Sequence, residues 1–522
     1  MRSTGDRTVP YFLEFHAAER PHEPALLTEF RGCRQIFSWQ ELNALADRTA
    51  HWILSQGLQP GQTFVIHLSN CLEAVLFWLA AAKSGTVCVP VNPASTPSEL
   101  SYLFEHSEAA FILTREETRE SVVGGLKIPG RRPGVVLVES ERLFGESALG
   151  AQVMRFPAEL PASTLDPLDF FAIMYTSGTT GRPKGVQLTH ASYVYGADVF
   201  ARCTYLGPQD RHLICLPLYH AAAQVHALTP SLIAGASVAV VERFSSSQFF
   251  AQALRTQATR AALFGAPLRM LLSYYSGKEP PRTGLRLVTF AQSLTEPQLA
   301  EWNARMAIPL MQLWGMTETV GLPIMVPLHG PRNNMSMGMP VAGYECKVVD
   351  EEGRDVTDGT PGELVVRAVP GWTTTSGYYK NPEATAELMQ NGWLYSGDRV
   401  VRDASGQFFF LSRFKELIKR AGENVSPLEV EAVLCEHPQV HESAVVGVPD
   451  AIRDEAIVAF VIPREGDSVD AEVLQHWCHQ YLTPVKVPEK FVAVADFPRT
   501  SVGKVQRHLL QIDFLQSGSL TE

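Results

Sequence analysis

Strand-like and helix-like segments alternate near the start of the chain, and this alternation constrains the fold more than any other feature. The strand-like runs are residues 63–68, 86–91 and 110–114, and the helix-like runs are residues 37–54, 71–85 and 97–107. The first helix opens with a capping box, because Ser38 can cap it and Glu41 lies three residues on. Strands that alternate with helices predict an α/β fold with a mostly parallel sheet and helices on both faces.

The pattern of helix-like and strand-like segments changes after residue 335, which indicates further domains. The chain has 522 residues, which exceeds what one hydrophobic core usually supports. Residues 335–411 contain short β-like runs between turns, and an α+β pattern of about 100 residues follows. We therefore predict a large N-terminal domain at 1–413, with mixed sheets flanked by helices and a β subdomain, and a small α+β C-terminal domain at 414–522.

Composition excludes some classes of function. A formal net charge of −11 argues against a nucleic-acid partner held by bulk positive charge. The eight cysteines form no C-x-x-C pair, so zinc and redox sites are poorly supported. No leader-like segment opens the chain, and its most apolar run, 74–82, is about half a membrane span. We expect a cytoplasmic protein without a membrane span.

A glycine-rich stretch, "TSGTTGRPKG" at 176–185, directly follows an apolar, strand-like run. Small residues let backbone N–H groups approach phosphate oxygens, and a cation can complete such a pocket. Counting from Gly178, the Walker pattern places its lysine at Lys184. Pro183 and Gly185, however, stand where that pattern requires Gly and then Ser or Thr. The stretch therefore predicts a phosphate-binding loop of another class, with an ordinary surface loop as the alternative.

Seven motifs occur in order along the chain. They are "YTSGTTGRPKGVQLTH" (175–190), "PLYH" (217–220), "QLWGMTET" (312–319), "GELVVRA" (362–368), "YSGDRV" (395–400), "SRFKELIKRAGENVSPLEVE" (412–431) and "PRTSVGKVQR" (498–507). Together they resemble the ANL superfamily of adenylate-forming enzymes, which comprises acyl- and aryl-CoA synthetases, peptide-synthetase adenylation domains and luciferases. The resemblance covers essentially the whole chain, with a general likeness to crotonobetaine/carnitine–CoA ligases and medium-chain acyl-CoA ligases.

This resemblance implies an AMP-forming acyl-CoA synthetase, an acid–thiol ligase that acts in two steps. A carboxylate attacks the α-phosphate of ATP to give acyl-AMP and pyrophosphate, and coenzyme A then accepts the acyl group and releases AMP. Cations, backbone donors and Mg²⁺ bring the two anions together and stabilise the leaving pyrophosphate. The implied cofactors and co-substrates are ATP, Mg²⁺ and coenzyme A.

The resemblance also implies roles for individual residues. The positions that would bind ATP and AMP are Thr176, Ser177, Gly178, Thr179, Thr180, Gly181, Lys184, Trp314, Gly315, Met316, Asp398 and Arg413. Thr317 and Glu318 match positions that contact the α-phosphate, and Glu318 would also hold Mg²⁺. Lys504 would orient the substrate carboxylate, while His220 would line the acyl pocket beside it. These four are the candidate catalytic residues.

Movement of the C-terminal domain is a further implication of the resemblance. The domain would act as a mobile lid that swings between two poses, one for each step. Lys415 matches the hinge position, and Gly422 with Glu423 would border the thiol tunnel in the second pose. An ordinary turn glycine is the alternative interpretation of Gly422.

The acid is the least constrained part of the prediction. The candidate acyl-pocket residues are Tyr219, Ala223, Gln224, Phe264, Gly265, Ala291, Gln292 and Leu313. No acidic side chain occurs in these runs, which weakens an amino acid or a quaternary-ammonium acid such as carnitine as the substrate. We favour a mostly apolar acid, either medium-chain, cyclic or a bulky natural product, with Gln224 and Gln292 supplying polar recognition.

Three alternatives stay open at this stage. The acyl group could be loaded onto a carrier-protein phosphopantetheine in place of coenzyme A. The chain could also be a catalytically silent ATP-binding regulator, although the expected functional residues are all present. A luciferase-like oxygenase is a more distant alternative. Relatives of this kind are commonly homodimers, and the sequence does not fix the oligomeric state.

Overall fold

The computed structural model describes most of the chain. The described residues are 5–126, 133–139, 144–161, 165–176, 183–291, 294–330, 332–420, 423–450, 454–466, 468, 470–500 and 503–516. The chain forms two compact units, Met1–Cys346 with Val366–Tyr395 and Lys347–Val365 with Ser396–Glu522. These units are defined by the compactness of the chain, whereas the predicted boundary after residue 413 is a functional one. That boundary stays a prediction.

A seven-stranded sheet of described residues lies in the first unit. Its strands in spatial order are β18 (Gly377–Tyr378), β8 (Lys184–Thr189), β7 (Phe170–Thr176), β4 (Val87–Pro90), β3 (Thr63–Ile66), β5 (Phe111–Thr114) and β6 (Gly134–Leu137). The strands from β7 to β6 are parallel, whereas β8 pairs antiparallel with both β7 and β18. The early alternation of strands and helices thus produces the predicted parallel sheet, and antiparallel strands extend it beside the glycine-rich stretch.

A second sheet of the same unit has nine strands within the described residues. In spatial order they are β15 (Met339–Pro340), β14 (Ile324–Met325), β13 (Leu310–Trp314), β12 (Leu287–Ala291), β11 (Arg260–Phe264), β9 (Arg211–Ile214), β10 (Ser237–Val241), β1 (Pro24–Phe30) and β2 (Cys33–Ser38). Neighbouring strands from β13 to β1 are parallel. Parallel strands end at the same edge, so the carboxyl ends of β11, β12 and β13 lie together.

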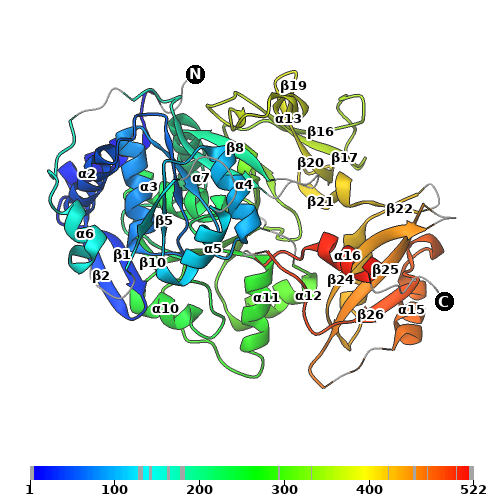
Figure 1. Ribbon diagram of the computed structural model, residues 1–522. Helices are drawn as coiled ribbons and strands as arrows, with labels where there is room; N and C mark the ends of the chain where they lie inside the picture. The colour runs from blue at the N-terminus through cyan, green and yellow to red at the C-terminus, as the bar shows by residue number, and fades with distance from the viewer. Residues whose placement is uncertain are drawn as a thin grey trace. The chain divides into compact units, whose positions relative to one another are not determined.

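Helices pack against these sheets in the first unit (Figure 1). They are α1 (Val9–Glu19), α2 (Trp39–Ser55), α3 (Leu72–Ser84), α4 (Pro97–Ser107), α5 (Arg119–Gly125), α6 (Ala148–Val153), α7 (His190–Thr204), α8 (Ala221–Ala223), the π-helical turn η3 (Gln224–Leu228), α9 (Thr229–Ala234), α10 (Phe249–Thr256), α11 (Gly265–Tyr274), α12 (Glu296–Arg305) and α13 (Pro382–Leu388). Ser38 and Glu41 form the predicted capping box of α2, and Thr189 caps α7.

A five-stranded sheet contains most of the β-like runs of residues 335–411, while β15 and β18 belong to the two larger sheets. Its order among the described residues is β16 (Cys346–Val349), β17 (Gly362–Arg367), β20 (Trp393–Arg402) and β19 (Met389–Gln390), and β21 (Phe408–Arg413) also pairs with β20. Pairing of β20 with β21 is antiparallel. These short strands confirm the change from helices to β structure that the sequence indicates.

The remaining part of the second unit has an α+β core (Figure 1, orange to red). Its strands in spatial order are β23 (Glu423–Val425), β22 (Ile418–Arg420), β25 (Asp454–Pro463) and β24 (Val440–Asp450), with β26 (Lys490–Ala493) paired to β25, and its helices are α14 (Pro427–Cys435), α15 (Ala471–Tyr481) and α16 (Arg507–Gln516). One apolar cluster includes Leu434 and Leu474 from α14 and α15, and another includes Phe514 from α16. The mixed α/β fold class predicted from the sequence is therefore confirmed.

Short helical turns complete the described structure. They are η1 (Glu116–Thr118), η2 (Phe144–Glu146), η4 (Thr317–Thr319), η5 (Phe414–Glu416) and η6 (Pro484–Lys486). None of the helices in the described ranges is long and apolar enough to cross a lipid bilayer.

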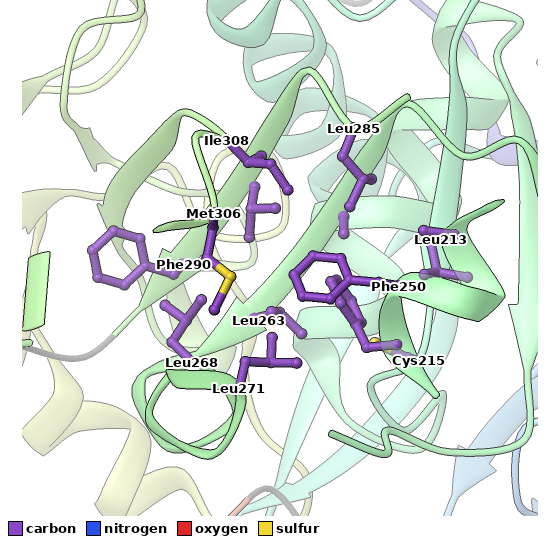
Figure 2. Close-up of a cluster of buried hydrophobic side chains, with 14 of the residues drawn as sticks. Leu213, Cys215, Phe250, Leu263, Leu268, Leu271, Leu285, Phe290, Met306 and Ile308 are labelled. Atoms are coloured by element: carbon purple, nitrogen blue, oxygen red, sulfur yellow. The ribbon is translucent and has the colours of Figure 1, made fainter. Parts of the chain in front are cut away.

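A large apolar cluster supports the nine-stranded sheet from one side (Figure 2). Leu213, Leu263 and Phe290 project from β9, β11 and β12 toward side chains of the covering helices. Phe250 of α10 lies in the middle of the labelled side chains and is fully buried. Because the strands that carry this cluster also end at the predicted acyl pocket, packing here fixes the position of that edge.

Replacement of Phe250 by alanine tests this dependence. We expect the free energy of unfolding to fall by about 3–5 kcal/mol, because the variant loses a buried ring and leaves a cavity. The measurement is urea denaturation followed by tryptophan fluorescence. Met270→Ala is the control, since the Met270 side chain is exposed on the adjoining helix α11. Equal stability of Phe250→Ala and the control would contradict the assignment of this cluster as a core.

Candidate active site

The two ends of the glycine-rich stretch are joined by strand pairing. Thr176 closes β7 and Lys184 opens β8, and these two residues face each other in the antiparallel ladder. The hairpin therefore begins at the carboxyl end of a buried strand, as the sequence predicts for a ligand-binding loop. The predicted phosphate contacts Ser177, Gly178, Thr179, Thr180 and Gly181 lie outside the described residues.

Glu318 is held in place by a segment about sixty residues further along the chain. It lies in η4, just after β13, and its side chain is buried. The Tyr378 hydroxyl donates to Glu318 Oε1 over 2.8 Å. The Thr375 N–H donates to the Glu318 carbonyl oxygen, also over 2.8 Å. The carboxylate and the main chain of Glu318 are thus both fixed by residues 375–378.

Tyr378 also contacts the lysine of the glycine-rich stretch. Lys184 Nζ lies 5.0 Å from the centroid of the Tyr378 ring, within the range of a cation–π interaction. Burial, followed in importance by the Glu318 carboxylate, raises the pKa of the Tyr378 phenol, so the hydroxyl stays protonated and can donate. The structure therefore brings Lys184 and Glu318, both candidates from sequence, to one tyrosine.

Sequence reasoning did not identify Tyr378. It stands in "TTTSGYY", a segment rich in Thr, Ser and Gly that predicts a turn and carries no charged residue. The signal that could have found it is the aromatic pair directly after that turn. An aromatic pair alone, however, is more often part of a core than of a site.

Asp398 and Arg413 form an ion pair in the second unit. Arg413 Nε lies 2.9 Å from Asp398 Oδ1, and the two residues are opposite each other on β20 and β21. Asp398 is buried, whereas the Arg413 side chain is 41% exposed. The Asp398 main-chain N–H donates to Ser396 Oγ, which fixes the main chain of β20 at the aspartate. Strand pairing thus places these two ribose-binding candidates side by side.

A short hairpin presents Lys504. Arg499 and Val505 form an antiparallel bridge, and Thr500 N–H donates to the Lys504 carbonyl oxygen over 2.7 Å. Gly503 has φ of +80°, a conformation that glycine adopts without strain. Arg499 also pairs with Glu442 of β24, which anchors the hairpin on the sheet. The Lys504 side chain is exposed, and its main chain is paired with Thr500 beside this anchored bridge.

Several acyl-pocket candidates gather at one edge of the nine-stranded sheet. Phe264 and Ala291 are paired at the carboxyl ends of β11 and β12, and Leu313 lies near the end of the adjacent β13. The His220 ring packs edge-on against the Phe264 ring, with 5.8 Å between centroids. His220 Nδ1 accepts the Ala222 N–H over 3.2 Å, which leaves its Nε2 to carry the proton of a neutral ring.

The other candidates follow the same elements or lie outside the described part. Trp314, Gly315, Met316 and Thr317 run from the end of β13 into η4, Gly265 begins α11, and Ala223 is buried in α8. Gln292 and Gly422 lie outside the described residues, as do the side chains of Lys415 and Glu423.

Gln224 is committed to a buried hydrogen-bond network. Its Oε1 accepts from Trp78 Nε1 over 2.8 Å and from the Tyr193 hydroxyl over 2.6 Å. Its Nε2 donates to the Leu218 carbonyl oxygen over 2.6 Å. Gln224 begins the π-helical turn η3 and, with Trp78 and Tyr219, borders a small apolar cavity. These bonds occupy both acceptor positions of the side-chain amide.

Comparisons with known sequences identify two protein families and several named enzymes that are similar to this chain. The AMP-binding enzyme family matches residues 13–379, and the AMP-binding enzyme C-terminal domain matches residues 429–504. A crotonobetaine/carnitine–CoA ligase from Citrobacter koseri is 33% identical over 494 residues, covering 91% of this chain and 93% of that protein. A ligase of the same name from Shigella flexneri is 32% identical over 504 residues, covering 94% and 96%.

Solved structures show the same fold. ATP-bound MatB from Rhodopseudomonas palustris has a TM-score of 0.87 and 27% identity, covering 97% of this chain and 99% of that one. The o-succinylbenzoate CoA synthetase MenE from Bacillus subtilis, in complex with the acyl-adenylate intermediate OSB-AMP, has a TM-score of 0.82 and 27% identity. That alignment covers 97% of this chain and 98% of MenE.

The fold and these matches define an adenylate-forming enzyme, which confirms the resemblance seen in the sequence motifs. The chain belongs to the AMP-binding enzyme family. It is an acyl-CoA synthetase, which joins a carboxylic acid to coenzyme A through an acyl-AMP with ATP as co-substrate.

Gln224→Leu tests whether the side-chain amide is structural. We expect a loss of about 2–4 kcal/mol in the free energy of unfolding, because Trp78 Nε1–H and the Tyr193 hydroxyl lose their buried acceptor. Urea denaturation measures this loss, with Gln40→Leu on the exposed face of α2 as the matched control. A Gln224→Leu variant with wild-type stability and a raised KM for the acid would instead assign the amide to substrate recognition.

Proposed function

We propose that the enzyme activates a mostly apolar carboxylic acid, of the medium-chain, cyclic or bulky natural-product kind. The carrying observation is that the acyl-pocket candidates at the carboxyl ends of β11, β12 and β13, which are Phe264, Ala291 and Leu313, are all uncharged. Phe264 and Leu313 are buried, and Ala291 is half-buried. An apolar acyl group gains binding energy from such a surface, whereas a charged group would lose hydration without a partner.

The nucleotide would bind through the motifs that resemble those of adenylate-forming enzymes. Residues Thr176–Lys184 would bind the β- and γ-phosphates, Thr317 and Glu318 would approach the α-phosphate, and Trp314–Met316 would contact the adenine. Asp398 would accept from the ribose hydroxyls, with Arg413 beside it. Contact of Lys184 and Glu318 with a single tyrosine supports their assignment to one phosphate site.

Mg²⁺ fits the donor set at Glu318. Among the described residues, no group of three or more His, Cys, Asp and Glu side chains could hold a metal ion by itself. A Mg²⁺ ion typically needs only one or two carboxylates when phosphate oxygens and water complete its shell. Glu318 is one such buried carboxylate, and a bound ion would neutralise phosphate charge during pyrophosphate departure.

Lys504 would orient the acid and the α-phosphate in the first step. Its exposed side chain on an anchored main chain supports this role, because the Thr500 N–H donates to the Lys504 carbonyl oxygen and the adjacent Val505 is bridged to Arg499. The segment 414–522 would act as the moving lid, with Lys415 as its hinge, and Gly422 and Glu423 would border the thiol path in the second step. His220 would position the acyl group beside the carboxylate. No general base is required, since the attacking carboxylate is already an anion.

The cellular setting is also a proposal. All eight cysteines are free thiols, which fits a reducing compartment, and we place the enzyme in the cytoplasm. A homodimer and a carrier protein as acyl acceptor are both compatible with the chemistry.

An acid panel tests the proposed substrate class. Pyrophosphate release is measured with acids graded by chain length, ring content and polarity, and crotonobetaine and carnitine are included because the sequence relatives bear those names. We expect the highest kcat/KM with apolar acids, and a preference of at least about tenfold over the quaternary-ammonium acids. Highest activity with crotonobetaine or carnitine would overturn the apolar assignment.

The same panel distinguishes coenzyme A from a carrier protein as the acyl acceptor. It also tests the alternative of a catalytically silent ATP-binding regulator. Thioester product is measured with coenzyme A and, separately, with a phosphopantetheinylated carrier protein. Efficient product with the carrier alone would identify it as the acceptor. ATP binding without pyrophosphate release from any acid would favour a silent regulator.

Lys504→Ala should separate the two steps. We expect adenylation to fall by about 10²-fold or more, because a positioned cation is lost from the reacting phosphate. Thioester formation from supplied acyl-AMP should stay within a few-fold of wild type. Lys278→Ala, an exposed lysine of the other unit, is the control for loss of a surface charge. Equal losses in both half-reactions would contradict the role of Lys504 in the first step.

A further inference from the structure

Tyr378 connects the two sheets of the first unit through its contact with Glu318. Its hydroxyl donates to Glu318 Oε1, and Glu318 follows β13 of the nine-stranded sheet. Its own short strand, β18, is the edge strand of the seven-stranded sheet. The Tyr378 phenol therefore links the edge of the seven-stranded sheet to the Glu318 carboxylate, which follows a strand of the nine-stranded sheet.

The backbone of Tyr378 is fixed on both sides. Tyr378 is paired with Val186 in the β18–β8 ladder, and its N–H donates to Thr385 Oγ1 over 2.9 Å. The preceding Gly377 has φ of +136°, and a Cβ there would lie 2.6 Å from Thr385 Cγ2. Only glycine fits at that position, so the approach of the tyrosine to Glu318 is built into the chain.

The Tyr378 side chain makes two chemically distinct contacts. The hydroxyl edge meets a carboxylate, and the ring lies near the ammonium of Lys184, with 5.0 Å between Nζ and the ring centroid. A carboxylate can accept about four hydrogen bonds or metal contacts through its two oxygens. One O–H donated to Oε1 therefore orients the group without using up its capacity to bind a ligand.

We propose that Tyr378 is a positioning residue for the nucleotide site, in which its hydroxyl orients the Glu318 carboxylate toward a divalent cation and its ring guides the Lys184 ammonium. This inference rests on the proposed roles of Glu318 and Lys184 in binding ATP and its metal. Partners that orient a ligating carboxylate typically change metal affinity by about 10–100-fold when they are removed. Tyr378 acts through Glu318 and Lys184 and need not touch the reacting atoms itself.

Tyr378→Phe separates the hydroxyl from the ring. The variant keeps the aromatic face beside Lys184 and loses the donor to Glu318. We expect Mn²⁺, as a probe for Mg²⁺, to bind the enzyme–ATP complex about 10–100-fold more weakly by electron paramagnetic resonance. ATP affinity without metal, by calorimetry, should stay within about threefold, since the ring and Lys184 remain. Tyr378→Leu should weaken both, because the ring is lost as well.

The neighbouring tyrosine provides the matched control. The Tyr379 hydroxyl points to Glu108 on the exposed surface, over 3.5 Å, so Tyr379→Phe removes the same atom without changing Glu318. We expect this control to bind Mn²⁺ and ATP as the wild type does. If Tyr378→Phe binds Mn²⁺ as tightly as the wild type, or more tightly, the positioning role is excluded.

Glu318→Gln distinguishes failure of this inference from failure of the proposed function. If Glu318→Gln leaves Mn²⁺ affinity unchanged, the metal role of Glu318 is wrong, and the inference falls with it. If Glu318→Gln weakens Mn²⁺ binding but Tyr378→Phe does not, only the positioning role fails. In the double variant, Tyr378→Phe should add nothing to the loss caused by Glu318→Gln, because the phenol acts through that carboxylate.

Discussion

Main-chain pairing of parallel strands is the constraint on which the site depends. β11, β12 and β13 are parallel neighbours, and their carboxyl ends bring Phe264, Ala291 and Leu313 to one edge although they are far apart in sequence. The same edge continues into η4, where Glu318 lies. The apolar cluster around Phe250 holds these strands from one side, so the proposed acid pocket and the proposed phosphate site share one support. A shift in that packing would move both together.

Two buried polar candidates of this unit, Gln224 and Glu318, differ in how the fold uses their hydrogen-bonding groups. The Gln224 amide uses three hydrogen bonds inside the protein, which ties α3, α7 and the π-helical turn together. The Glu318 carboxylate accepts an oriented hydrogen bond from the Tyr378 hydroxyl at Oε1. The fold therefore fills both acceptor positions of the Gln224 amide, whereas at Glu318 the Tyr378 hydroxyl orients a charged group.

Much of the fold follows from local sequence patterns, because those patterns act over a few residues. The capping box at Ser38, the alternation that forms β3, β4 and β5, and the Thr189 cap are all present in the structure. Motif resemblance located Lys184, Glu318, Asp398 and Arg413, and the structure brings each of them to another named residue. What the sequence could not provide is Tyr378, because its partners are created by the meeting of two sheets. A contact of that kind depends on tertiary register and leaves no periodic pattern.

The charged candidate residues of each unit are held by partners from the same unit. Within the first unit, Lys184 and Glu318 are held by Tyr378. Within the second, Arg413 is paired with Asp398, and the hairpin of Lys504 is anchored through Arg499 and Glu442. Each arrangement is made by contacts inside its own unit. In the proposed mechanism, the lid withdraws Lys504 after the first step and brings the thiol path to the acyl-AMP for the second. This movement would not have to break the contacts that hold the candidate residues within each unit. Rigid bodies with internally complete contacts, joined by a few residues that absorb backbone rotation, are the physical requirement for such an exchange.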